Sequence, residues 1–131
     1  MSDLILAALA YLIPAFAVAF VWHLKLFTER YDRLEIYRET ALPAFGLSSM
    51  AIQAILFGLV YVNLIVPNIE SWLVRGAAYF VFGALLSWSF TTLAVAGKTR
   101  MTSIRDYVTI ETAFTAVQWL AIALVTALIV G

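Results

Sequence analysis

The sequence predicts an all-α, polytopic membrane protein whose four transmembrane helices form an antiparallel bundle. Its 131 residues are 64% hydrophobic and only 12% charged. A soluble domain is about 45–50% apolar and about 25% charged, so lipid is the expected solvent for most of this chain. Four apolar stretches are each long enough to cross about 30 Å of hydrocarbon. The length leaves room for one domain, and we expect residues 1–131 to form a single transmembrane domain.

Short polar segments separate the four expected spans. Each span should be helical, because a lone strand leaves its backbone groups unpaired in lipid. The first apolar run exceeds the apolar core of a cleavable signal peptide, which indicates a retained span. Pro67-Asn68 and Gly97-Lys98 interrupt the chain on either side of the third span. The predicted spans cover about residues 4–24, 42–66, 71–96 and 104–130.

Basic residues predict the orientation of the spans. Short cytoplasmic loops of membrane proteins carry an excess of lysine and arginine. Arg75 is the only basic residue on one side of the predicted membrane. The others lie in or beside loops 25–41 and 97–104: Lys25, Arg30, Arg33, Arg38, Lys98, Arg100 and Arg105. We therefore expect these two loops to be cytoplasmic and both termini to be extracytoplasmic.

The loop between the first two spans is expected to be helical. Acids and bases alternate over residues 25–40 at helical spacing, with Glu29 four residues before Arg33 and Glu35 three before Arg38. Such pairs stabilise an exposed helix. We interpret the loop as a solvated cytoplasmic helix that extends the first span or lies at the headgroups.

Glu111 is the first candidate for a functional residue. It lies about 7–8 Å inside the fourth span from Arg105 and Asp106, at the usual rise per residue. A carboxylate at that depth should face protein or a wet cavity and have a partner. Further polar residues are expected in the same cytoplasmic half of an antiparallel bundle. The candidate polar pocket comprises His23, Ser49, Gln53, Glu111, Thr115 and Gln118.

Two interpretations of this polar set are open. Polar side chains between membrane helices often serve as interhelical hydrogen bonds, worth about 0.6–2 kcal/mol each. Alternatively, Glu111 and His23 relay protons, while Gln53 and Gln118 orient a solute. The position of His23 near the membrane interface also fits a capping role.

Small residues at helical spacing mark one face of the third span. Gly83 and Ser87 form a small-xxx-small pair, which permits close approach of another helix. This face could pack inside the bundle, against a second copy in a homo-oligomer, or against a larger membrane complex. The predicted helix-packing face consists of Gly76, Gly83, Ser87, Thr91 and Ala94.

Several classes of function lack support in the sequence. There is no cysteine and only one histidine, so we expect no metal site, no bis-histidine haem and no other cofactor. The balance of eight basic and eight acidic residues gives no field that favours nucleic acid. Gly-rich phosphate loops and serine-hydrolase elbows are absent from the sequence.

Three short motifs resemble a family of uncharacterised bacterial four-helix integral membrane proteins, classed as a domain of unknown function. They are Trp22-His23 with Leu26-Phe27, the segment from Gly83 to Trp88, and the segment from Ile110 to Phe114. The resemblance implies a bacterial inner-membrane location and no assigned activity.

Three functions follow from these observations as hypotheses. The first is binding or transport of a small solute or proton through a cytoplasm-facing polar pocket around Glu111. The second is a non-catalytic structural or accessory subunit of a larger membrane complex. The third, and least favoured, is a lipid- or quinone-modifying enzyme with Glu111 and His23 as acid and base.

Overall fold

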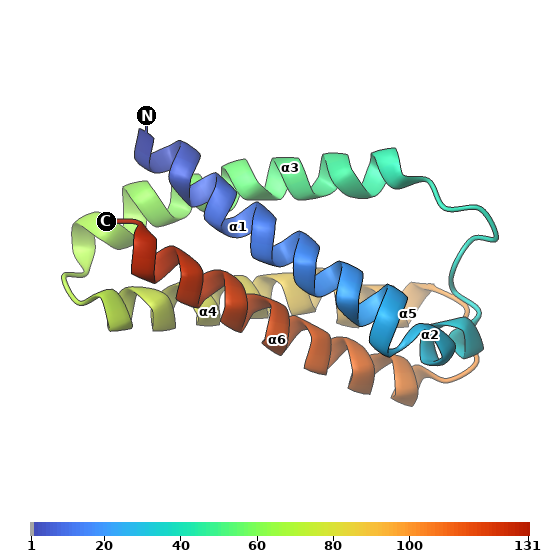
Figure 1. Ribbon diagram of the computed structural model, residues 1–131. Coiled ribbons are helices and arrows are strands. Elements are labelled where there is room, and N and C mark those ends of the chain that lie inside the picture. Colours follow the sequence, from blue (N-terminus) through green and yellow to red (C-terminus); the bar gives the residue numbers. More distant parts are fainter. Residues whose placement is uncertain (1) are drawn as a thin grey trace.

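Four long helices dominate the computed structural model, which describes residues 2–131 (Figure 1). Continuous helical runs cover Ser2–Leu26, Pro43–Asn68, Trp72–Lys98 and Ile104–Ile129. The shortest has 25 residues, or about 37 Å at the usual rise, which exceeds the hydrocarbon thickness of about 30 Å. The prediction of four membrane-length apolar helices is confirmed, and we treat the chain as a multi-pass membrane protein.

Three of these runs contain a π-helical turn that the sequence pattern did not indicate. Such turns hold one extra residue, and they occur often at functional sites. The described elements are α1 (Ser2–Val21), η1 (Trp22–Leu26), α2 (Thr28–Leu34), α3 (Pro43–Val60), η2 (Tyr61–Ile65), η3 (Val66–Asn68), α4 (Trp72–Trp88), η4 (Ser89–Leu93), α5 (Ala94–Lys98) and α6 (Ile104–Ile129).

Figure 1 shows the N- and C-terminal ends of the chain at the same end of the molecule. The short helix α2 and the connection between α5 and α6 lie at the opposite end, which we call the loop end. Helix α6 packs against both α1 and α4, and α1 also packs against α3. The first and fourth spans thus each pack against two others, and the fourth is the most buried of the four spans.

The loop before α3 is helical over a shorter stretch than expected. Helix α2 ends at Leu34, because Glu35 adopts a left-handed conformation with φ of 57°. Residues 36–42 form no helix, so the expected Glu35–Arg38 helical pair has no helix to hold it. The expected pairing of Glu29 with Arg33 is also absent, since the only ion pair within 4.0 Å among residues 2–131 involves His23.

An aromatic cluster around Trp119 fills the centre of the fold. The Trp119 ring makes edge contacts with Phe57, Tyr79 and Tyr11 at centroid distances of 4.7, 5.3 and 5.6 Å. Gly83 of α4 makes room for it, because a Cβ atom there would overlap the indole ring. Close approach of α4 and α6 thus depends on a residue without a side chain.

The predicted packing face of the third span divides in two. Gly76 and Gly83 face α6, next to Ala127 and Trp119. Thr91 and Ala94 are exposed in the single chain, whereas Thr92 is fully buried. Thr91 and Thr92 both lie in the π-helical turn η4, where the spacing of side chains around the helix axis departs from 3.6 residues per turn. A packing face predicted at a constant 3.6 residues per turn therefore does not include Thr92.

Candidate functional site

Glu111 is buried beside two aromatic hydrogen-bond donors from the loop end. Its residue exposure is 7%. The hydroxyl of Tyr31, from α2, donates to Glu111 Oε1 at 2.5 Å. The indole Nε1 of Trp22, from η1, donates to the Tyr31 oxygen at 3.0 Å. Glu111 thus accepts at the end of a directed chain of hydrogen-bond donors that runs from Trp22 through Tyr31.

His23 lies on another side of the same carboxylate oxygen. Its Nε2 atom is 3.7 Å from Glu111 Oε1. Its Nδ1 atom is 3.0 Å from the carbonyl oxygen of Ala19, which can only accept, so the hydrogen-bond network assigns a proton to Nδ1. In a neutral ring Nε2 would then present a lone pair to the carboxylate. The contact is attractive only when an additional proton lies on His23 or on Glu111.

Tyr31 keeps its proton over the whole physiological range. Burial, together with its hydrogen bond to Glu111, raises the pKa of this phenol well above its ordinary value. The ring also lies 4.4 Å from the His23 ring, centroid to centroid. Tyr31 is therefore a fixed hydrogen-bond donor in the site.

Ser49 and Gln53 form a separate hydrogen-bonded group on α3. The Gln53 amide donates to Ser49 Oγ at 2.8 Å, and its carbonyl oxygen accepts from the Tyr11 hydroxyl at 2.5 Å. Tyr11 belongs to α1, so this group joins the first two spans. It shares no hydrogen bond with Glu111 among the contacts of residues 2–131.

Thr115 and Gln118 follow Glu111 along the buried face of α6. Gln118 donates to the carbonyl oxygen of Ala15, one residue after Pro14 of α1, at 3.0 Å. Thr115 is buried one turn from Glu111. The structure therefore brings His23 to Glu111 and places Thr115 and Gln118 on the same face. Convergence of all six predicted residues on a single pocket stays a prediction.

Tyr31 and Trp22 belong to the site but were not among the residues predicted for the polar pocket. A buried carboxylate needs donors, and a tyrosine on an adjoining loop helix is a suitable donor. The feature of the sequence that could have indicated this donor is a tyrosine, Tyr31, in the helical loop that adjoins the spans. Its pairing with Glu111, however, spans 80 positions and depends on how α2 folds back onto α6.

Several buried hydroxyl groups have no protein partner in the described part of the chain. Within residues 2–131, four such oxygens lack a hydrogen bond. A buried polar group without a partner costs about 1–3 kcal/mol, and bridging water is the usual partner of such an oxygen. They belong to Tyr61, Tyr79, Thr92 and Thr126.

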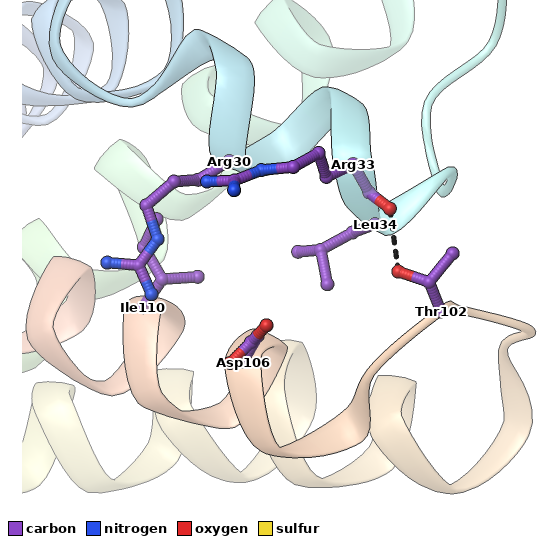
Figure 2. A pocket seen from close by; sticks show the side chains of 6 residues that line it. All are labelled: Arg30, Arg33, Leu34, Thr102, Asp106 and Ile110. Carbon is purple, nitrogen blue, oxygen red and sulfur yellow. Dashed lines mark hydrogen bonds between the residues drawn. The ribbon is translucent and has the colours of Figure 1, made fainter.

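The two cavities at the loop end are not lined by any of these four residues. One, with a volume of about 410 Å³, is lined by residues of α2, the α5–α6 connection and α6 (Figure 2). A second, of about 340 Å³, runs along η1 and α2. Both are bordered by Arg30 and Arg33. Among residues 2–131, no cluster of three or more His, Cys, Asp or Glu side chains is arranged to hold a metal ion.

Comparisons of the chain with protein-family models, with curated proteins and with solved structures found no match. The resemblance to bacterial four-helix membrane proteins stays a prediction.

Proposed function

We propose that this membrane protein binds a proton at the His23–Glu111 pair and moves protons, or a small solute coupled to them, across the bilayer. The supporting observation is the 3.7 Å contact between His23 Nε2 and the buried Glu111 carboxylate. With Nδ1 committed to a carbonyl group, this contact calls for an added proton. Ionisable residues inside membrane spans commonly belong to ion or proton pathways.

The proposal includes a topology. The four spans form an antiparallel bundle in a bacterial inner membrane, with the basic loop end in the cytoplasm and both termini outside. The Lys and Arg distribution supports this orientation, and Figure 1 places both termini at one end. The proton site then lies near the cytoplasmic interface, where His23 is half-buried and within reach of water.

Transport, rather than binding alone, is supported by a set of buried polar side chains that we call the polar track: Thr115, Gln118, Thr126, Tyr79 and Tyr61. Thr115, Gln118 and Thr126 continue from Glu111 along the buried face of α6. Tyr79 and Tyr61 have ring centroids 4.9 Å apart in the core, and neither hydroxyl has a protein partner within residues 2–131. Water molecules that bridge such groups would extend a proton path toward the terminal end of the bundle.

Replacing Glu111 with glutamine tests the proposal. Glutamine keeps the size and an acceptor oxygen for Tyr31 but binds no proton at this position. A positioned proton-transfer group is typically worth a factor of about 100 or more, so we expect proton flux to fall by about 100-fold. The measurement is proton uptake by proteoliposomes that contain a pH-sensitive dye, driven by a potassium diffusion potential.

The matched control is Glu39→Gln, which removes an exposed carboxylate from the same side of the protein. It should leave the flux unchanged. Undiminished flux in Glu111→Gln would reject proton transport through this site. That result would leave the accessory-subunit hypothesis, in which a second copy or a larger membrane complex covers exposed residues such as Thr91 and Ala94.

Tyr79→Phe tests whether the polar track takes part in transport. The substitution removes only a hydroxyl that has no protein partner within residues 2–131, so the free energy of unfolding should stay the same or rise. If bridging water uses this hydroxyl, proton flux should fall severalfold in the same proteoliposome assay. Unchanged flux with unchanged stability would place the pathway elsewhere.

A further inference from the structure

Charged side chains gather at the loop end without pairing to one another. Among residues 2–131, the single ion pair within 4.0 Å is that of His23 with Glu111. Arg30 and Arg33 therefore have no carboxylate at ion-pair distance, although Asp106 borders the same 410 Å³ cavity. The cavity is thus lined by two cationic side chains and one anionic side chain that form no ion pair with one another.

Figure 2 shows how this cavity is arranged. The side chains of Arg30 and Arg33 extend from α2 across one wall, and Asp106 lies on the facing wall, on α6. The hydrogen bond drawn there joins the Thr102 hydroxyl to the backbone carbonyl oxygen of Arg33. Buried Leu34 and Ile110 supply the apolar part of the lining.

Backbone contacts fix the two walls relative to each other. The Thr102 hydroxyl donates to the Arg33 carbonyl oxygen at 2.6 Å, and the Thr102 N–H donates to the Leu34 carbonyl oxygen at 3.2 Å. The loop before α6 is thereby attached to the C-terminal end of α2. Binding of a ligand to a preformed cavity costs less free energy, because the protein groups around the ligand are already ordered.

From this geometry we infer a binding site for the zwitterionic headgroup of an amino-phospholipid, of the phosphoethanolamine class. The guanidinium groups of Arg30 and Arg33 receive the phosphate, because arginine binds phosphate through paired N–H donors. The primary ammonium of the headgroup lies against the Asp106 carboxylate. A bare phosphate would face that carboxylate with like charge, so the facing acid selects a ligand that carries both charges.

The location of the cavity favours a lipid over a free metabolite. Ile110, in its wall, is adjacent to Glu111 in an apolar span. Asp106 lies in the first turn of that span, and Arg30 lies on α2, beyond the end of the first span. This level is where headgroups meet a multi-pass protein, and basic residues between helices there bind lipid headgroups. The volume of about 410 Å³ falls within the range of about 300–1,000 Å³ for small-molecule sites. Apolar Leu34 and Ile110 suit the glycerol end of the lipid.

Binding of soluble short-chain lipids to the purified full chain tests the inference. Calorimetric titration in detergent compares dihexanoyl phosphatidylethanolamine, phosphatidylcholine and phosphatidylglycerol with inorganic phosphate. Phosphatidylethanolamine should bind at least tenfold more tightly than the others, because choline has no N–H donor and glycerol has no cation. Arg30→Gln with Arg33→Gln should weaken binding of phosphatidylethanolamine by about tenfold or more, as expected for loss of charged hydrogen bonds.

Asp106→Asn should abolish the preference for ethanolamine over choline while phosphate-dependent binding persists. Arg105→Gln is the matched control, because Arg105 is exposed next to Asp106 but does not line the cavity; it should bind like the parent. Circular dichroism verifies that each variant is folded. Equal affinity for all three lipids, retained binding in the double arginine variant, or inorganic phosphate binding as tightly as phosphatidylethanolamine would each overturn the inference.

Discussion

Replacing Gly83 with alanine is expected to destabilise the protein by about 1–3 kcal/mol, the usual cost of overpacking a core. An alanine Cβ at this position would overlap the six-membered ring of Trp119. The indole is fixed in turn by edge contacts with Tyr11, Phe57 and Tyr79, so it has no free space to move into. The free energy of unfolding is measured by circular dichroism during SDS titration in mixed micelles.

Gly46→Ala provides the matched control within another span. Its Cβ would meet no atom within 4 Å, and alanine favours a helix over glycine by up to about 1 kcal/mol. This variant should therefore be as stable as the parent or slightly more stable. Combining Gly83→Ala with Trp119→Phe should restore part of the loss by shortening the aromatic side chain. Equal stability of Gly83→Ala and Gly46→Ala would contradict the packing of α4 on α6 through Trp119.

Much of the architecture could be predicted because it depends on local sequence. Span length follows from uninterrupted apolar residues, and the fourth helix begins at Ile104, as predicted. Burial of Glu111 was expected because a carboxylate within a span must avoid hydrocarbon. Close packing at Gly83 was expected because small residues permit helix contact. Each of these inferences needs only the composition of a single helix.

The contacts of the site could not be predicted in the same way. Tyr31 reaches Glu111 only because α2 folds back on α6, and Gln53 bonds to Tyr11 rather than to Glu111. Both outcomes depend on the rotation of one helix against another. The π-helical turns η1 and η4 change that rotation by one residue, and no residue pattern marks them. Within η4, Thr92 is buried whereas Thr91 is exposed.

The coupling between His23 and Glu111 is the second large effect we expect, because it concerns a charge inside the fold. His23→Leu leaves the Glu111 carboxylate without the imidazole whose Nε2 atom lies 3.7 Å from it. Removing one member of a fully buried pair costs about 3–5 kcal/mol, and partial exposure of the histidine reduces this to about 2 kcal/mol. Side chains of 21% and 9% exposure form the pair, so water screens it only in part. Stability is measured by the same SDS titration.

A double-mutant cycle separates this coupling from the other contacts of each residue. His23→Leu also loses the bond to Ala19, and Glu111→Gln weakens the acceptor of Tyr31, but the cycle subtracts both effects. We expect the double variant to be more stable than the sum of the single losses predicts, by about 1–2 kcal/mol. A parallel cycle of His23→Leu with Glu39→Gln should show no coupling, because Glu39 is exposed and unpaired with His23. Simple additivity in the first cycle would mean that no proton is shared between imidazole and carboxylate. Proton binding at this pair, and the transport proposed from it, would then lose its physical basis.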